Sequence, residues 1–293
     1  MKRRRLIHLA QTGALSALAT GLCSSVLMRD WQGRSLRSLA QADNPSDLKV
    51  QWLGHTCFLF TGGGLKVLVN PFRPIGCTAK YPSPKVNTDL VLISSRLLDE
   101  GSVDNFPGSP SLLYEPGVYQ FNGSQIQGIR TIKDRKQGRQ FGTNVAWLWS
   151  QAGIKMLHLG GLAGSIDLEE RILIGRPDVL FVPVGGGPKS YTPEEARQAI
   201  ATLKPKLVIP THYKTVASDP ATCDLEPLED FLSVMQGTPV QRIEGNTLSL
   251  NRDRLPDEGP VIQVFDYSFG LAPVSPAKTP EAGSNSAPVA PSP

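Results

Sequence analysis

The sequence predicts an α/β protein whose buried strands alternate with helices. Three short, largely apolar runs, at residues 90–93, 179–184 and 206–209, have the length and composition of strands that are covered on both faces. Between the last two runs, Thr192-Pro-Glu-Glu195 predicts a helix start, because a Thr cap, a proline at the first helical position and a glutamate at the third form a capping box. Strands and helices in this order indicate sheets with helices outside them.

The first half of the chain is predicted to be rich in strands. Residues 48–69 form two strands joined by Thr61-Gly-Gly-Gly64, because a glycine run between two β-rich segments is typical of a hairpin. Residues 73–88 contain several prolines and are predicted to form a surface loop. Further short strands, with turn dipeptides between them, are expected at 109–114, 117–121 and 124–131.

The second half repeats this pattern. Strands are expected at 145–149, 154–159, 179–184 and 206–209. The helix that begins after Thr192 has apolar residues at the spacing of an amphipathic helix. The last of these strands carries His212 at its end, and loops at strand ends are where sites are usually built.

Three parts of the chain are expected. Residues 1–42 form a signal segment of the twin-arginine type, because Lys2-Arg-Arg-Arg5 precedes an apolar stretch and Ala40-Gln-Ala42 offers a small-residue cleavage site. Residues 43–270 form the folded domain, and the Pro-rich residues 271–293 form a disordered tail. We therefore expect export to the periplasm or an equivalent compartment. There are two alternatives for this N-terminal segment. It could be an uncleaved membrane anchor, in which case it is the one part that would contact a membrane, or an artefact of the gene start.

The net charge of +4 is concentrated in the signal segment. Residues 1–42 hold seven of the 30 basic residues and one of the 26 acidic residues. The rest of the chain therefore has 23 basic and 25 acidic residues. A slightly acidic domain gives no electrostatic reason to expect nucleic acid as a partner. A Cys77–Cys223 disulfide would suit an oxidising compartment, but the sequence does not establish that contact.

Several segments carry a resemblance to a known family. They are Trp52-Leu-Gly-His-Thr-Cys-Phe58, Val67-Leu-Val-Asn-Pro-Phe72, Thr131-Ile-Lys-Asp134, Gly142-Thr-Asn144, His158-Leu-Gly-Gly161, Pro183-Val-Gly-Gly186 and Ile209-Pro-Thr-His-Tyr-Lys214. Across residues 48–250 the chain resembles the metallo-β-lactamase superfamily, most closely its branch of ascorbate-6-phosphate-lactonase-like metal-dependent hydrolases. The resemblance implies a four-layer αββα metallo-β-lactamase sandwich with a two-metal active site.

The resemblance also implies metal ligands, most of which this chain lacks. Asp99 and His212 are retained. Other residues stand at the remaining positions: Ser95, Leu97, Lys133 and Glu100 in place of histidines, and Asn70 and Gly161 in place of aspartates. Outside the signal segment the histidines are His55, His158 and His212, too few for the four or five imidazoles that the family uses. The sequence therefore predicts that the standard two-metal site is absent.

Two arrangements of the residual site are open. In the first, Asp99, Glu100 and His212 hold one zinc, iron or manganese ion, because two carboxylates and an imidazole resemble the facial triad that binds iron. In the second, which we favour, no cofactor binds, and Lys133 or Arg96 supplies the positive charge that buried carboxylates need. A cation at a former ligand position would repel a metal ion.

Further residues are expected to line the same pocket: His55, Asn70, Lys133, Asp134 and His158. His55 and His158 are expected to be hydrogen-bonded structural histidines that support the strand ends. The charged run at residues 133–139 is either a phosphate site or, as we favour, a solvated loop.

These observations lead us to expect an exported protein of this fold that is a non-catalytic binding module, a pseudoenzyme whose partner is an unidentified small molecule or protein. The alternative is a metal-dependent hydrolase of a small ester, lactone or phosphorylated compound with a reduced single-metal site. A third alternative is a structural role in an envelope complex through the Pro-rich tail. Filling of the pocket by Leu97 and Lys133 favours the first, and carboxylates near His212 favour the second.

Overall fold

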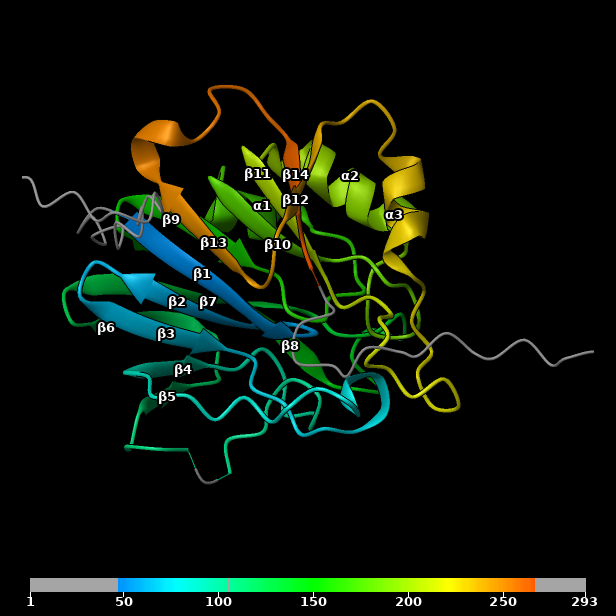
Figure 1. Cartoon of the computed structure of the whole chain (residues 1–293), viewed down its shortest axis with the longest axis horizontal. Helices are drawn as coiled ribbons and strands as arrows, with labels where there is room; N and C mark the ends of the chain where they lie inside the picture. Colours follow the sequence, from blue (N-terminus) through cyan, green and yellow to red (C-terminus); the bar gives the residue numbers. More distant parts are fainter. Residues whose placement is uncertain (1–46, 105, 267–293) are drawn as a thin grey trace, which may run out of the picture. The chain divides into compact units, whose positions relative to one another are not determined.

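The computed structural model describes residues 47–104 and 106–266, which form a six-stranded and an eight-stranded β-sheet (Figure 1). The predicted signal segment at 1–42 and tail at 271–293 lie outside the described residues. The boundaries proposed for the folded domain, 43 and 270, therefore stay predictions.

The six-stranded sheet has the order β13-β1-β2-β3-β4-β5. Its strands are β1 (Asp47–Gly54), β2 (Cys57–Gly62), β3 (Leu65–Val69), β4 (Leu90–Leu92), β5 (Ser111–Leu113) and β13 (Thr247–Asn251). The segment 48–69 thus forms three strands, and the prediction of two was wrong. A turn divides the segment at Gly54 and His55, whose φ angles of 112° and 55° do not occur in extended strands.

The eight-stranded sheet has the order β12-β14-β11-β10-β9-β8-β7-β6. Its strands are β6 (Gly117–Phe121), β7 (Ser124–Ile132), β8 (Thr143–Gln151), β9 (Ile154–His158), β10 (Val179–Pro183), β11 (Leu207–Thr211), β12 (Val240–Ile243) and β14 (Val261–Phe265). The strands predicted between residues 117 and 209 are all present. Neighbours are antiparallel from β6 to β9 and parallel from β9 to β12.

The main apolar core lies between the two sheets. Side chains alternate along a strand, so Phe58 and Phe60 of β2 join this core whereas Cys57 packs in a second cluster outside it. The ring of Phe60 lies 5.0 Å from Trp149 and 5.2 Å from Phe181, both on the other sheet. Each such side chain contributes roughly 1.5–3 kcal/mol by its burial.

Three helices belong to the eight-stranded sheet (Figure 1). They are α1 (Leu168–Ile174), α2 (Pro193–Leu203) and α3 (Leu228–Val234). Helix α2 begins as predicted, because the Thr192 hydroxyl accepts from the Glu195 N–H and the Glu195 carboxylate accepts from the Thr192 N–H. Helix α1 contacts β7, helix α2 contacts β10, and helix α3 contacts α2. Within residues 47–104 and 106–266, no helix is long and apolar enough to cross a membrane.

A loop covers the outer face of the six-stranded sheet. Phe72 and Tyr81 of this loop pack on Leu68 of the sheet, and its one regular turn is η1 (Gly76–Thr78). A Cys77–Cys223 disulfide ties the loop to the segment that follows β11. The predicted α/β sandwich is confirmed, with this outer layer built from loop in the described residues.

The fold brings several strand ends to one edge. Strands β3 and β4 are parallel, as are β9, β10 and β11, and parallel strands end at the same edge of their sheet. The segments that follow these strands carry most of the residues that the sequence singled out.

Candidate metal centre

The loop after β4 carries the two predicted carboxylates. The Glu100 N–H donates to the Leu97 carbonyl over 2.9 Å and closes a turn that holds Asp99 and Glu100 together. Gly101 follows, and a Cβ there would collide with the carbonyl oxygen of Ser95. The loop therefore closes on itself only because residue 101 has no side chain.

His55 reaches the same place from the turn between β1 and β2. The carbonyl of His55 accepts a hydrogen bond from the Trp52 indole over 3.1 Å. A Cβ at Gly54 would lie 2.8 Å from the Tyr81 ring, so the covering loop presses directly on this turn. The Nε2 atom of His55 is buried and has no hydrogen-bond partner among the described residues. This differs from the hydrogen-bonded structural histidine that we predicted.

Strand β11 delivers His212, as predicted. The five residues of this strand are buried, and His212 follows them with a φ of 54°. The Gly185 N–H, after β10, donates to the His212 carbonyl over 3.1 Å. A Cβ at Gly185 would collide with that carbonyl oxygen, so the close approach of these two strand ends requires glycine.

His55, Asp99 and His212 converge into one group. One ligand atom from each lies within 4.8 Å of the others, and the two imidazole rings meet edge to face with centroids 4.4 Å apart. Both ring nitrogens of His212 are buried without a hydrogen-bond partner in the described residues. Burial lowers the pKa of both imidazoles, and the Lys133 ammonium lowers that of His212 further. Both rings are therefore neutral and keep lone pairs.

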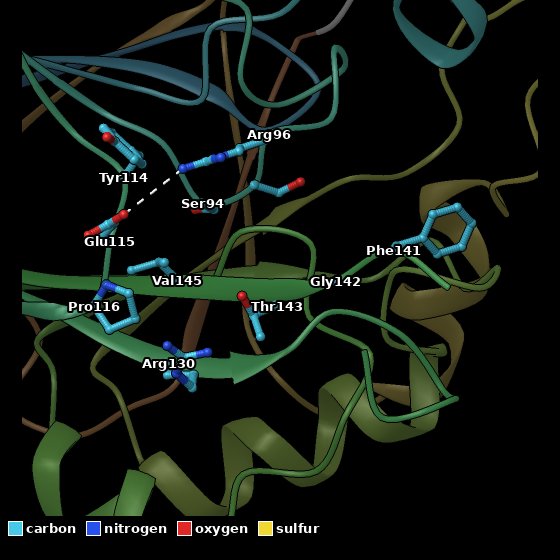
Figure 2. A pocket seen from close by; sticks show the side chains of 11 residues that line it. Ser94, Arg96, Tyr114, Glu115, Pro116, Arg130, Phe141, Gly142, Thr143 and Val145 are labelled. Atoms are coloured by element: carbon cyan, nitrogen blue, oxygen red, sulfur yellow. Dashed lines mark ion pairs between the residues drawn. The ribbon is translucent and has the colours of Figure 1, made fainter. Parts of the chain in front are cut away.

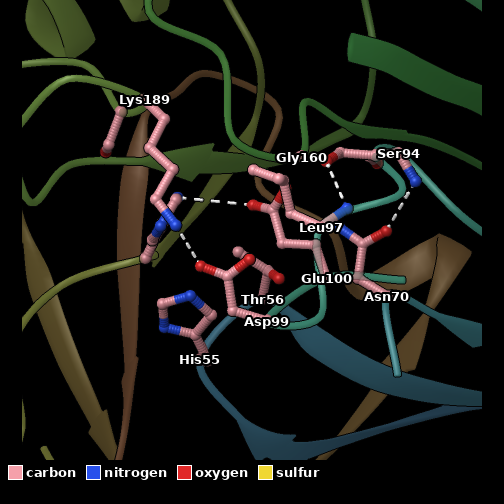
Figure 3. Close-up of polar contacts among 12 residues, drawn as sticks. His55, Thr56, Asn70, Ser94, Leu97, Asp99, Glu100, Gly160 and Lys189 are labelled. Carbon is pink, nitrogen blue, oxygen red and sulfur yellow. Dashed lines mark hydrogen bonds and ion pairs between the residues drawn. The ribbon is translucent and has the colours of Figure 1, made fainter. Parts of the chain in front are cut away.

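Lys189, in the loop after β10, forms an ion pair with the Asp99 carboxylate (Figure 3). Their side chains are 18% and 15% exposed, whereas both imidazoles are buried, so the group opens to solvent at this pair. Burial alone would raise the pKa of Asp99, but Lys189 holds it well below its ordinary value. Burial would lower the pKa of Lys189, and Asp99 raises it instead. Lys189 was not predicted from the sequence, in which its one signal is the glycine run at residues 185–187, separated from it by a proline.

A second ion pair joins Lys133 to Glu100, and neither side chain has any exposed surface. The Glu100 Oε1 atom lies 3.5 Å from Nδ1 of His212. A Cβ at Gly161 would collide with both the Lys133 ammonium and the Glu100 carboxylate. The ion pair that we favoured for Lys133 is thus present, and Glu100, which we named as a metal ligand, is held by this lysine.

The other predicted pocket residues support the framework. The Asn70 side-chain oxygen accepts the N–H of Ser94, after β4, over 2.8 Å. The Asp134 carboxylate accepts four backbone N–H groups from residues 136–141 and organises that loop. His158 bonds to the Thr56 carbonyl through Nε2 and accepts the Gly160 N–H at Nδ1, each over 3.1 Å. Its lone pairs are used within the fold.

Arg96, the other predicted partner for the carboxylates, lies elsewhere. Its guanidinium is 5.0 Å from the centre of the Tyr114 ring and 4.0 Å from the Glu115 carboxylate. It lines a cavity of about 520 Å³ (Figure 2), to which none of His55, Asp99 and His212 contributes. In the charged run 133–139, Arg135 pairs with Glu195 of α2, so this side chain does not belong to a free phosphate site.

Comparison with known proteins identifies the family. Residues 49–212 match the family described as the beta-lactamase superfamily domain. This range contains His55, Asp99 and His212. The chain belongs to the metallo-β-lactamase superfamily. The finer prediction, membership of the ascorbate-6-phosphate-lactonase-like branch, stays a prediction.

Relatives within the superfamily point to hydrolases. A protein of Pelotomaculum thermopropionicum named a metal-dependent hydrolase is 31% identical over 207 residues, covering 59% of this chain and 89% of that protein. One of Thermoplasma volcanium with a similar name is 28% identical over 202 residues, covering 59% and 88%. The crystal structure of a Thermotoga maritima protein, described as a candidate Zn-dependent hydrolase of this superfamily, has a TM-score of 0.60 and 31% identity, covering 74% and 98%.

These findings overturn the predicted non-catalytic binding module, which was wrong. The relatives are named metal-dependent hydrolases, and the structure holds a group of residues that suits a metal ion. The expectation that no cofactor binds is therefore not supported. The error arose because ligands were counted only at positions taken from the family, which left out His55.

The donor set of this metallo-β-lactamase-superfamily protein fits one metal ion. Two neutral imidazoles and a carboxylate are ligands that zinc, iron and manganese accept, and Nε2 of His55 and both ring nitrogens of His212 have no hydrogen-bond partner in the described residues. A second ion beside them fits poorly. The Lys133 ammonium fills the space next to Glu100, and Gly161 has no side chain that could bridge two ions.

The buried neutral histidines should make the fold sensitive to acid. Burial lowers the pKa of His158 from 6.5 to about 3, so as the pH falls below 6.5 the unfolded chain takes up a proton that the folded chain does not. The free energy of unfolding should fall by about 1.4 kcal/mol per pH unit for this residue. Urea titrations across this pH range measure how steeply the free energy of unfolding falls with pH. His158→Gln should reduce that slope by the contribution of one proton. A slope that this variant leaves unchanged contradicts the assignment.

Removing only one member of the buried ion pair should be costly. Lys133→Met leaves Glu100 charged and buried without its partner, which should lower the free energy of unfolding by about 3–5 kcal/mol. Lys133→Met combined with Glu100→Gln should recover much of that loss in urea unfolding. As a control, Lys206→Met breaks a partly exposed pair with Asp178 at 3.9 Å and should cost less than about 1 kcal/mol. Equal losses in the single and double variants would argue against this coupling.

Proposed function

We propose that the protein is a metal-dependent hydrolase of a small ester, lactone or phosphorylated compound, with one metal ion held by His55, Asp99 and His212. The observation that carries this proposal is the convergence of three ligand atoms within 4.8 Å of one another. The names of the relatives support the reaction class. Membership of the superfamily supports the placement of such a site at this edge of the two sheets.

The donor chemistry indicates which ions suit the group. When bound, a zinc, iron or manganese ion supplies a Lewis acid and lowers the pKa of a bound water. Imidazole nitrogens favour these ions over calcium and magnesium, which prefer oxygen ligands throughout. Three protein ligands are also the number that catalytic zinc sites use.

The chain's own groups prepare this chemistry. Burial keeps both imidazoles neutral, and the Glu100 carboxylate favours the tautomer of His212 with its proton on Nδ1, which leaves the lone pair on Nε2. Lys133 and Glu100 fill the interior side of the group and exclude water from it. Substrate therefore approaches from the side of Asp99 and Lys189, whose side chains are partly exposed.

Metal titration followed by hydrolysis assays tests the proposal. Zinc, iron or manganese added to the purified protein should bind at about one equivalent in calorimetry, and the loaded protein should hydrolyse members of a panel of small esters, lactones and phosphate esters. His212→Ala should weaken binding by at least about a hundredfold and abolish hydrolysis, because it removes one of three ligands.

A matched pair of variants controls for charge. Asp99→Asn should weaken metal binding. Asp178→Asn should not, because Asp178 precedes β10 and lies at the end of that strand away from the site. Binding of two equivalents contradicts the single-ion site. Binding that survives His212→Ala unchanged places the ion elsewhere, and a protein that binds no ion contradicts the proposal as a whole.

We also propose that the protein is exported to the periplasm or an equivalent compartment and loses residues 1–42. The arginine run and Ala40-Gln-Ala42 support this, as does the Cys77–Cys223 disulfide, a bond that persists in oxidising compartments. A membrane would then be met only through the signal segment, and the partner of the mature protein is its small-molecule substrate.

N-terminal sequencing of the protein from its native host tests export. The mature chain should begin after Ala42, and replacing Arg3 and Arg4 together with lysine should keep the protein inside the cell. Arg34→Lys, in the same segment but outside the run, should not affect transport. A chain that begins at Met1 in the exported fraction argues for an anchor, and one found only inside the cell contradicts export.

A further inference from the structure

We propose that Lys189 is an exchangeable counter-ion: it neutralises Asp99 until a metal ion binds and then binds an anionic group of the substrate. This inference rests on the proposed single-ion site. It narrows the substrate to a compound that carries a carboxylate or a phosphate. The observation behind it is that the one carboxylate of the candidate ligand group is already paired with an ammonium group.

Lys189 and a metal ion compete for the same carboxylate. The Lys189 ammonium donates to Oδ2 of Asp99 (Figure 3), and a positive charge this close to a ligand opposes a second cation there. Binding of an ion to Asp99 is therefore favoured when the ammonium moves away. Because the lysine remains tethered near the site, its charge is available for another anion.

The two lysines of the site differ in their freedom to move. Lys133 and its partner Glu100 have no exposed surface, and the Gly161 backbone packs directly against them. Lys189 and Asp99 lie at the solvent edge, 18% and 15% exposed. The loop before Lys189 contains glycines at 185–187, and solvent is available to the long side chain. Lys133 is a fixed charge, whereas Lys189 is able to exchange partners.

The charges of the site indicate what the released lysine binds. In the two ion pairs, the ammonium groups of Lys133 and Lys189 balance the carboxylates of Glu100 and Asp99. Binding of a divalent ion therefore gives the site an excess of positive charge. Such a site favours an anion, which can reach the partly exposed Lys189 from solvent. A carboxylate or phosphate on the substrate would make a charge-assisted hydrogen bond with this ammonium.

The test compares Lys189→Met with the unmodified protein and with Lys206→Met, which removes a lysine from a pair at the opposite end of β10. Zinc affinity is measured by competition with a chelating dye, and binding of inorganic phosphate to the zinc-loaded protein by calorimetry. Lys189→Met should tighten zinc binding about tenfold and weaken phosphate binding about tenfold. Lys206→Met should change neither, and Lys189→Arg should retain phosphate binding. Thermal unfolding checks that each variant is folded.

The outcomes separate this inference from the proposed function. If the unmodified protein binds one zinc ion that His212→Ala removes, but Lys189→Met binds zinc with unchanged affinity, the counter-ion role is overturned and the single-ion site stands. Phosphate binding that Lys189→Met leaves unchanged overturns the anionic substrate. If no His212-dependent zinc binding occurs, the proposed function fails, and the inference fails with it.

Discussion

Charge balance at the strand ends is the constraint on which the rest of this site depends. Two carboxylates, two ammonium groups and two imidazoles meet where little water reaches them, and an unpaired charge there would cost several kcal/mol. Each carboxylate therefore has its own lysine, Glu100 with Lys133 and Asp99 with Lys189. Glycine at position 161 is required by the same arrangement, because a side chain there would collide with the Lys133–Glu100 pair.

The two pairs divide the site into a closed and an open side. Lys133 pairs with Glu100 on the closed side, but a lysine side chain has no open coordination position at which to bind and acidify a water, as a metal ion has. The proposed metal-dependent chemistry therefore belongs to the open side, where His55, Asp99 and His212 meet. This arrangement reconciles a chain that has few histidines with relatives that are named metal-dependent hydrolases.

Local patterns predicted the parts of the fold that local physics controls. The apolar runs that became β4, β10 and β11 are strands because they are covered on both faces, and α2 begins at Thr192 because its capping box satisfies backbone groups there. The turn at His55 was missed. Gly54 and His55 sit within a run of β-forming residues, and the turn depends on packing of the Tyr81 ring, from a distant loop, against Gly54.

The sequence by itself determined the fold family and the retention of Asp99 and His212, and it favoured an ion pair of the buried carboxylates with Lys133 or Arg96, because these follow from residue type at the positions of a familiar pattern. Only the tertiary structure decided that His55 lies beside Asp99 and His212. It also decided that Glu100 pairs with Lys133 and that Lys189 pairs with Asp99 on the open side. Lys189 and Asp99 stand 90 positions apart. Contacts of that kind depend on where two sheets bring their strand ends together, and no local pattern encodes that meeting.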